Sequence, residues 1–203
     1  MTILSAQQLL DLPKYSRINL INTLSGPRSG NLIGTVSTEG VSNLAVFNTV
    51  THIGANPPYL GFIMRPLTVE RHTYENIKQT GHFTINPINS TIIDQAHQTS
   101  AKYDSGTSEY EATGLTEVTY GDFPVPFVKE SNYGIGLSYQ EEQPILCNGT
   151  VLIIGKVEMV YLPESGLSED YSINHEALNS VAIGGLDTYY STKFLDRKAF
   201  ARP

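Results

Sequence analysis

The 203-residue sequence has one cysteine, no tryptophan and few cations. With Cys147 alone, an intrachain disulfide and a zinc site built from several thiolates are both excluded. No stretch approaches the ~18 consecutive apolar residues that a membrane-spanning helix needs. Lys and Arg number 13 against 20 Asp and Glu, giving a net charge of −7, which speaks against a nucleic-acid partner because such binding needs clustered cations.

Targeting signals are also missing from the first residues, MTILSAQQLLDLPKY. They contain neither a basic n-region nor a long apolar run, so they do not form a signal peptide. Asn89 and Asn148 each begin a glycosylation sequon, which we read as chance matches without export. The expected compartment is the cytoplasm.

Several catalytic motifs are absent. The sequence contains no G-x-G-x-x-G, no Walker loop, no H-E-x-x-H and no G-x-S-x-G, which leaves nucleotide-binding, zinc-protease and serine-hydrolase fingerprints without support. The five histidines are scattered without the spacing of metal ligands. Each is read as a surface or hydrogen-bonded histidine, and no metal site or catalytic residue is assigned.

The elements that are present indicate one mainly β domain with helical insertions. Composition is ordinary for a globular chain, with 40% apolar and 16% charged residues, and 203 residues suit a single domain over 1–203. Roughly seven strands at short spacing favour a closed or half-closed barrel over a doubly wound sheet. Strands are expected at 16–24, 31–38, 41–50, 59–64, 82–86, 114–120, 127–139 and 149–162, and helices at 5–12, 68–81, 90–103 and 108–115.

The segment NLIGTVSTEGVSNLAVFNTV (31–50) contains polar residues where a buried strand is expected. Ser42, Asn43, Asn48 and Thr49 are interleaved with apolar side chains. A buried amide or hydroxyl without a partner costs about 1–3 kcal/mol. Either these groups cap turns and bond neighbouring strands, or a ligand supplies their partners.

A longer stretch, PRSGNLIGTVSTEGVSNLAVFNTVTHIGANPPYLGF, resembles the flavin reductase-like FMN-binding split barrels. That family has Pro-Arg-Pro-Ile, Val-Ser-Thr, a Gly turn, Asn-Leu-Ala-Pro-Phe-Ser and later Asn/Asp-Pro-Pro. RHTYENIKQTGHFTIN resembles its Lys-Asp-Thr-(x)2-Asn-Ile segment, and Gly184, Gly185 and Tyr189 match its Gly-Gly-x-x-x-Tyr. The resemblance covers about residues 13 to 190 and implies an FMN-binding split β-barrel.

The sequence departs from the family pattern at several places. Ser29, Val46 and Asn48 replace two prolines and a serine, and the usual Glu-Cys segment is altered around YGIGLSYQ. Arg71-His72-Thr73 stands for Lys-Asp-Thr, which keeps the cation and removes a negative charge.

The resemblance implies a set of FMN-binding residues. Arg71 and Thr73 are expected to hold the phosphate, because a helix beginning near 71–73 leaves free backbone N–H groups there. The full implied set is Arg28, Thr35, Ser37, Ser42, Asn43, Leu44, Ala45, Phe47, Asn48, Arg71, Thr73 and Tyr189.

The function implied is that of an FMN-binding oxidoreductase of flavin reductase or flavoredoxin type, with NAD(P)H as the expected donor. The resemblance also implies a homodimer, and the 12 tyrosines offer amphipathic interface residues. Two alternatives stay open at this point. One is a non-catalytic FMN store or sensor, and the other is a flavin-free barrel whose pocket has decayed.

Overall fold

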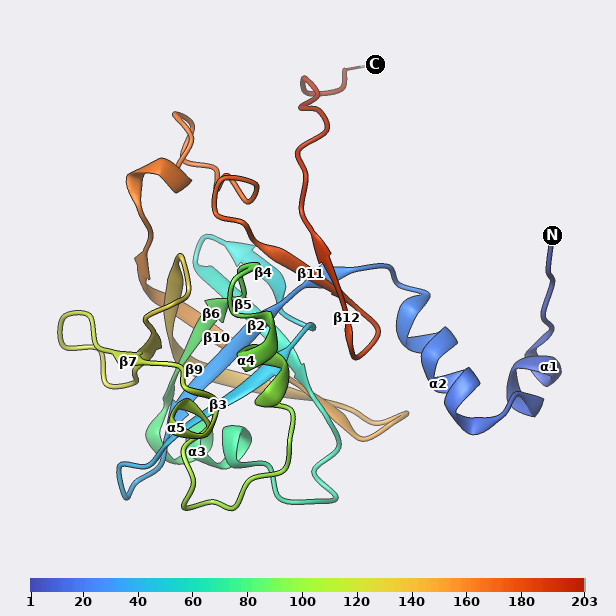
Figure 1. The fold of residues 1–203 in the computed structure, drawn as a ribbon, viewed down its shortest axis with the longest axis horizontal. Coiled ribbons are helices and arrows are strands. Elements are labelled where there is room, and N and C mark those ends of the chain that lie inside the picture. Colours follow the sequence, from blue (N-terminus) through green and yellow to red (C-terminus); the bar gives the residue numbers. More distant parts are fainter. Residues whose placement is uncertain (203) are drawn as a thin grey trace.

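The computed structural model describes residues 1–202, which form twelve strands, five α-helices and one short 3-10 helix. Strands account for 36% of the chain and helices for 19%, so the expected mainly β class with helical insertions is confirmed. Figure 1 shows the strands gathered in one body, from which the N-terminal helices and the C-terminal tail project.

The body is built on a seven-stranded antiparallel sheet with the order β3-β2-β6-β9-β10-β5-β4. Strands β2 and β3 form the predicted hairpin around Gly40, whose φ of +83° suits glycine. β4 lies in a connection for which no strand is expected from the sequence. The strands are β2 (Asn31–Val36), β3 (Ser42–Phe47), β4 (Thr51–Ala55), β5 (Pro58–Met64), β6 (His82–Pro87), β9 (Gly134–Ile145) and β10 (Thr150–Tyr161).

The sheet curls until the end of β3 meets β5. The Thr49 hydroxyl accepts a hydrogen bond from Ile63 N and donates one to Ile63 O, both at 3.1 Å. Beside it, the rings of Phe47 and Phe62 meet edge to face with their centroids 4.9 Å apart. A side chain therefore takes the place of a backbone ladder at this seam, as a split barrel requires, and the predicted split β-barrel is confirmed.

Two hydrophobic clusters hold the barrel and its helices together. Phe62, Phe83 and Leu137, all fully buried, belong to the cluster that fills the barrel. Leu44 and Tyr110 belong to a second cluster that packs the helical insertions against β3. Those insertions are α4 (Ile93–Gln98) and α5 (Glu109–Thr113), both shorter than the expected helices at 90–103 and 108–115.

Helix α3 (His72–Thr80) begins where the sequence predicts a helix start, with Arg71 as its N-cap. It buries Thr73, Asn76 and Ile77, which share one face at i, i+3 and i+4 spacing. The helix ends at Gly81, whose left-handed φ of +75° terminates it as a C-cap.

The strand expected at 16–24 is wrong, because this segment forms α2 (Lys14–Thr23). Its partial polar–apolar alternation also contains helical spacings, Ile18 with Ile21 and Leu20 with Leu24. Arg17 Nη1 donates to the carbonyl of Leu10 at 2.6 Å, which occupies one of the free carbonyls at the end of α1 (Ala6–Asp11). The predicted capping box of Ser5 and Gln8 is present at the start of α1.

Two smaller sheets complete the fold. β1 pairs with β11, and β11 forms a hairpin with β12 around Gly185, so the predicted Gly184-Gly185 break is the turn of this hairpin. The second sheet contains only β7 and β8. These elements are β1 (Arg28–Ser29), β7 (Glu117–Val118), β8 (Phe127–Val128), the 3-10 helix Glu164–Gly166, β11 (Val181–Gly184) and β12 (Thr188–Ser191).

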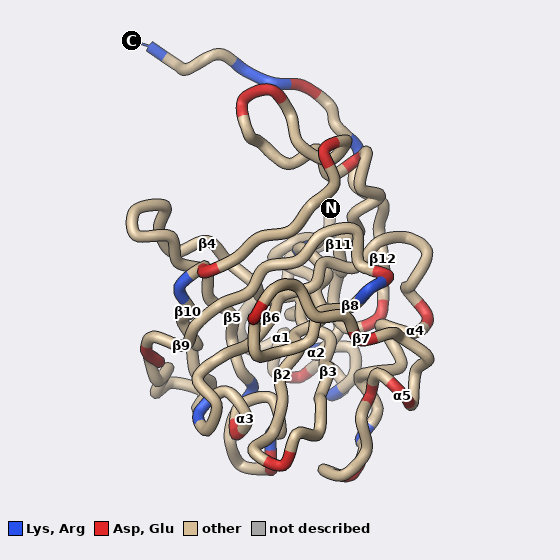
Figure 2. Tube along the Cα trace, turned by 90° about the vertical axis from the view of Figure 1, so that its left-hand side faces the viewer, with Lys and Arg blue, Asp and Glu red and all other residues tan. Residues whose placement is uncertain are grey.

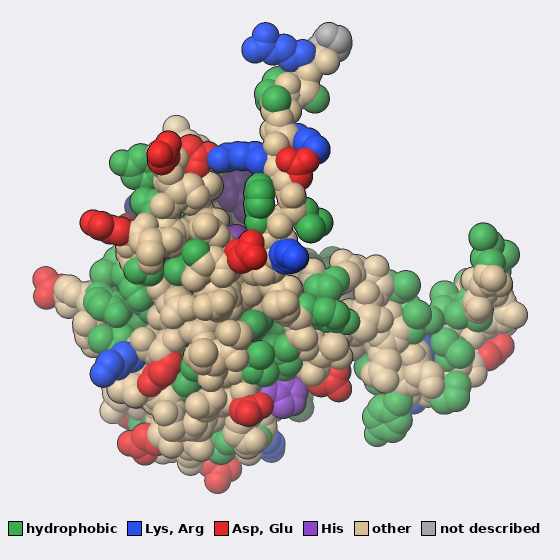
Figure 3. Space-filling view, turned by 45° about the horizontal axis from the view of Figure 1, so that its top comes forward, with side chains coloured by type: hydrophobic (Ala, Val, Ile, Leu, Met, Phe, Trp, Pro, Cys, Tyr) green, Lys and Arg blue, Asp and Glu red, His purple; other side chains and the backbone are tan. Residues whose placement is uncertain are grey.

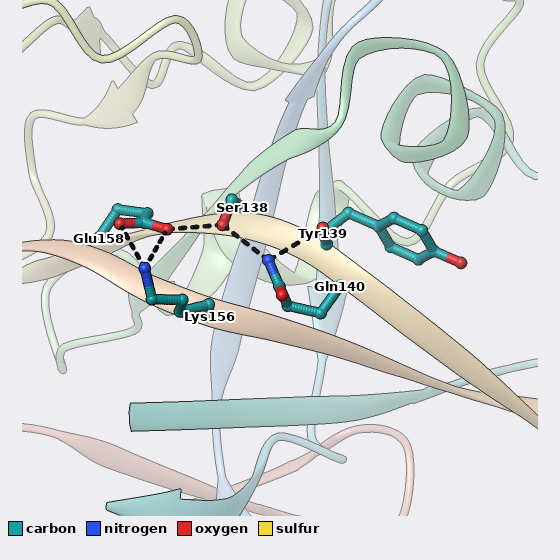
Figure 4. Close-up of polar contacts among 5 residues, drawn as sticks. All are labelled: Ser138, Tyr139, Gln140, Lys156 and Glu158. Carbon is teal, nitrogen blue, oxygen red and sulfur yellow. Dashed lines mark hydrogen bonds and ion pairs between the residues drawn. The ribbon is translucent and has the colours of Figure 1, made fainter. Parts of the chain in front are cut away.

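The long β9–β10 pair contains a bulge at Gln140, where the register shifts between Ile154 and Gly155. Gln140 Nε2 donates to Ser138 Oγ at 3.2 Å, and Ser138 Oγ donates to Glu158 at 2.8 Å. Figure 4 shows this exposed chain of contacts, which Lys156 completes by pairing with Glu158 at 3.1 Å. The contacts bridge both strands beside the bulge.

Gly155, opposite the bulge, gives a first prediction. A Cβ atom at Gly155 would lie 2.5 Å from the Phe83 ring and 3.1 Å from Leu137 Cβ. We expect Gly155→Ala to lower the free energy of unfolding by about 1–3 kcal/mol through overpacking, measured by urea unfolding. The control is Gly106→Ala, where nothing lies within 4 Å and the backbone is unstrained. Equal stability of the two variants would contradict the packing described here.

Candidate functional site

A buried hydrogen-bonded node joins α3 to the β2–β3 hairpin. Asn43 Nδ2 donates to Thr35 Oγ1 at 3.3 Å and to Thr73 Oγ1 at 3.1 Å. Asn76 Nδ2 also donates to Thr35 Oγ1, at 3.1 Å. All four side chains are at least 93% buried, so these bonds fix the start of α3 against the hairpin. Three predicted site residues, Thr35, Asn43 and Thr73, are thus in direct contact.

The start of α3 leaves polar hydrogens without acceptors. The backbone N–H groups of His72, Thr73 and Tyr74 lie in the first turn, and none has an acceptor among residues 1–202. The Nε atom of Arg71 is buried and likewise has no partner in the described chain. A helix N-terminus carries roughly half a positive charge, and Arg71 adds a full one. This corner is therefore electrostatically suited to an anion.

Two recesses flank this corner and differ in charge. One, of about 380 Å³, lies between the hairpin turn, α3 and the 105–107 loop, and its wall includes Glu39, Glu70 and Glu75. The other, of about 270 Å³, is formed by residues 67–71, Tyr74 and Glu75 and contains Arg71. Figure 2 shows acidic positions at the hairpin turn and along α5. Glu70 and Glu75 border both recesses, so the Arg71 recess is the less acidic of the two because it gains Arg71 and lacks Glu39.

A second group of predicted residues lies at the far end of β3. Arg28 in β1 pairs with Ile183 of β11, and its buried Nε has no partner among the described residues. Asn48 Nδ2 donates to the carbonyl of Gly185 at 2.8 Å and thereby ties the end of β3 to the β11–β12 turn. Gly185 adopts the left-handed φ of +66°, which glycine tolerates.

Tyr189 lies in the β11–β12 hairpin and faces α4. Its hydroxyl is 3.2 Å from His97 Nδ1, and the two rings meet edge to face with centroids 5.8 Å apart. Burial raises the pKa of Tyr189 above its ordinary value, and Asp187 adds to the shift. The hydroxyl is therefore protonated at neutral pH.

The polar residues of the 41–50 segment all have partners within the protein. Ser42 donates to Glu117 and contacts Ser108 Oγ at 2.7 Å. Asn43 belongs to the Thr35 node, Asn48 bonds Gly185, and Thr49 closes the barrel on Ile63. Burial of these groups therefore needs no ligand, and the buried side-chain atoms left unpaired in residues 1–202 are instead Arg28 Nε, Arg71 Nε and Ser131 Oγ.

Ser37 shapes the hairpin turn, because its Oγ accepts from the backbone N–H groups of Glu39 and Val41 at 3.2 Å each. Leu44 is fully buried in the core, whereas every residue from Ala45 to Val50, Phe47 among them, is only half-buried. This partly open edge runs between the two groups of predicted residues. From Asn43 to Asn48 an extended strand spans about 16 Å.

Two residues of the site region are missing from the sequence prediction. Asn76 follows Thr73 by three positions on α3, and this i, i+3 spacing could have signalled a shared face. Glu109 is 6% exposed and accepts a hydrogen bond from Leu44 N at 2.9 Å. No local pattern marks Glu109, because its partner lies 65 residues away.

Neither a metal-binding cluster nor a membrane-spanning helix is present in residues 1–202. Within that range, no three His, Cys, Asp or Glu side chains come together in a way that could hold a metal ion. Likewise, none of the helices in that range is long and apolar enough to cross a bilayer.

Known proteins resemble this chain in both sequence and fold. The family model described as "Flavin reductase like domain" matches residues 27–181. A solved structure of a candidate flavin reductase with a split barrel domain, from Shewanella frigidimarina, is 45% identical, with a TM-score of 0.95 over 99% of this chain and 100% of that one. Nitrilotriacetate monooxygenase component B from Bacillus cereus shares the fold at 22% identity and a TM-score of 0.84, each chain being covered to 98%. Flavoredoxin of Desulfovibrio vulgaris (Miyazaki F) does so at 23% identity and 0.76, over 88% of this chain and 94% of that one.

Glu109 gives a prediction about pH. Burial raises the pKa of Glu109 above its ordinary 4.5, with the Leu44 N–H bond opposing the shift. A raised folded-state pKa means that the folded protein binds the proton more tightly than the unfolded chain. The free energy of unfolding therefore falls as pH rises through 4.5 to the folded-state pKa, and levels off above it. We expect Glu109→Gln to remove this decline, measured by urea unfolding across pH 4–8.

Two further variants serve as comparisons for Glu109. Glu109→Ala leaves Leu44 N–H without an acceptor and should cost about 1–3 kcal/mol, whereas Gln retains an acceptor oxygen. Glu111→Gln, on the exposed side of α5, should keep the pH profile of the unaltered protein. If Glu109→Gln had the same pH profile as the unaltered protein, the Glu109 carboxyl would not contribute to the pH dependence of the free energy of unfolding.

Proposed function

Because the chain belongs to the flavin reductase-like domain family and is an oxidoreductase, we propose that it binds FMN and passes electrons from NAD(P)H to an acceptor. The observation that carries the proposal is the pair of buried, unpartnered Nε atoms of Arg28 and Arg71. They lie at opposite ends of the partly open edge of β3. A ligand with an anionic group at one end and polar acceptors at the other would meet a donor from each arginine.

The phosphate of FMN is proposed to bind at the start of α3. Arg71 offers charged donors, and the first-turn N–H groups offer neutral ones. The Thr73 hydroxyl accepts from Asn43 and keeps its own hydrogen for a further acceptor. Because the Thr35 node already holds Thr73 in place, the phosphate would meet donors that need little reorganisation.

The isoalloxazine ring is proposed to lie along Ala45, Phe47 and Asn48, toward Arg28. Leu44 N points away from β2 toward Glu109, and strand alternation directs the N–H and C=O of Val46 the same way. Bound flavin would supply the redox chemistry by accepting hydride and releasing electrons, while the protein binds and orients it. Arg28 would add positive charge near the ring.

We also propose that the protein acts as a homodimer, as the family resemblance implies. Flavin binding without turnover is the alternative function, and the donor experiment below separates the two.

The phosphate site predicts a difference between two flavins. Arg71→Ala should weaken FMN binding by about 1.5–3 kcal/mol, or ~10- to 150-fold, because a charged hydrogen-bond donor is lost. Riboflavin lacks the phosphate, so its affinity should stay nearly unchanged. Both affinities are measured by quenching of flavin fluorescence.

Arg28→Ala and Arg65→Ala provide the matched comparisons. Arg28 is proposed to lie at the ring end, so its removal should weaken FMN and riboflavin equally. Arg65 is exposed outside the site and its removal should affect neither. Equal losses of FMN and riboflavin affinity in Arg71→Ala would mean that Arg71 serves the fold and not the phosphate.

The oxidoreductase proposal is tested by reduction without oxygen. The purified protein should carry or take up FMN and show the flavin absorption bands, which NADH or NADPH should bleach under anaerobic conditions. Reduction by dithionite but by neither nucleotide would reject NAD(P)H as donor, and reoxidation by a ferredoxin-type carrier would then favour flavoredoxin-like transfer. A protein that takes up no FMN would refute the proposal as a whole.

A further inference from the structure

The first 24 residues form an arm that leaves the barrel. Figure 1 shows α1 and α2 standing apart from the sheet, and Figure 3 shows apolar side chains gathered on this projection. None of the residues of either helix, all of them described, is buried. The barrel therefore buries none of the side chains of these two helices.

The arm helices are too short to be stable alone. α1 has 6 residues and α2 has 10, whereas isolated helices below about 12–15 residues are marginal in water. Packing of an apolar face normally supplies the missing stability. A folded arm therefore implies a surface against which it packs.

Large apolar side chains are available on the arm for such packing. Leu10 is 64% exposed, Ile21 is 48% exposed and Leu24 is 67% exposed. Tyr15 adds an aromatic ring that is 76% exposed. Single exposed apolar residues are normal, but several on one short projecting segment indicate an interaction surface.

The total surface area supports a partner of substantial size. The described chain exposes 12,261 Å², whereas a compact monomer of 22.3 kDa exposes about 9,400 Å². The excess, roughly 2,900 Å², arises from chain that projects at both ends. Stable interfaces bury about 800 Å² per partner, and obligate dimers bury more. The projecting chain thus offers enough area for a permanent dimer.

We infer that the arm of each protomer packs on a second copy of this chain, reciprocally across a two-fold axis, an inference that rests on the proposed homodimer. Charge favours this occupant, because the arm contains two of the 13 cationic side chains and one of the 20 acidic ones, and the remaining chain is strongly acidic. Thr23, in the last turn of α2, lies beside Gly185, where its Cγ2 would be 3.1 Å from an added Cβ. The arm therefore leaves the barrel next to the turn that Asn48 anchors, and the dimer contact borders the flavin site.

The test compares two double variants of the full-length chain by sedimentation equilibrium. Ile21→Glu with Leu24→Glu places two charges on the apolar surface and should raise the dimer dissociation constant at least 100-fold. Ser16→Glu with Asn19→Glu adds the same charges at exposed polar positions of α2 and should change it less than 5-fold. All four side chains are exposed, so both proteins should fold.

Amide hydrogen exchange gives a second measurement on the unaltered protein. Residues 14–24 should be protected at high protein concentration and lose protection on dilution below the dissociation constant. Protection that stays the same on dilution would mean that the arm folds on its own barrel. An unchanged dimer dissociation constant in Ile21→Glu with Leu24→Glu would mean that the dimer interface lies elsewhere. Either result overturns the arm inference while the homodimer stands.

A monomeric mass for the unaltered protein at every concentration overturns both the arm inference and the homodimer. FMN titration of the same samples separates this outcome from the flavin proposal. An arm-dependent dimer that takes up no FMN would leave the arm inference intact and refute the flavin proposal.

Discussion

The geometry of the candidate site depends on one buried hydroxyl, that of Thr35, which accepts from two amides at once. Asn43 and Asn76 come from a strand and a helix, and burying their amides elsewhere would leave donors unsatisfied. The helix can therefore dock on the hairpin only in the register that brings Asn76 to Thr35. That register also sets where Arg71 and the free N–H groups of the first turn lie.

The site is thus assembled before any ligand arrives. The polar side chains of the 41–50 segment already form hydrogen bonds within the protein, at Ser42, Asn43, Asn48 and Thr49. The buried side-chain atoms left without partners in the described chain are the Nε atoms of Arg28 and Arg71 and, outside this segment, Ser131 Oγ. A scaffold that satisfies these neutral side chains and leaves donors of two arginines free favours an anionic ligand, which is the property expected of a site for a flavin phosphate.

Local pattern and family resemblance predicted the barrel, the hairpin around Gly40 and the start of α3, because each rests on neighbouring residues or on a matched motif. The strand predicted at 16–24 is wrong because a short segment with Ile18, Leu20 and Ile21 fits both periods, and the segment forms α2. Glu109 and the Thr49–Ile63 bond were out of reach, since they join positions distant in the chain that no spacing rule connects. The contacts of Asn48 with Gly185 likewise depend on how the last hairpin folds back.

Closure of the barrel by the Thr49 side chain has a consequence for motion. A backbone ladder opens cooperatively, because its bonds share the same two strands, whereas the Thr49 hydroxyl can leave Ile63 by one rotation about χ1. We therefore expect the seam to fluctuate independently of the sheet, with the half-buried stretch from Ala45 to Val50 moving with it. A barrel closed by one side chain combines a rigid hydrogen-bonded sheet with a mobile segment beside the seam. A planar ring could then enter edgewise at this segment without unfolding a strand.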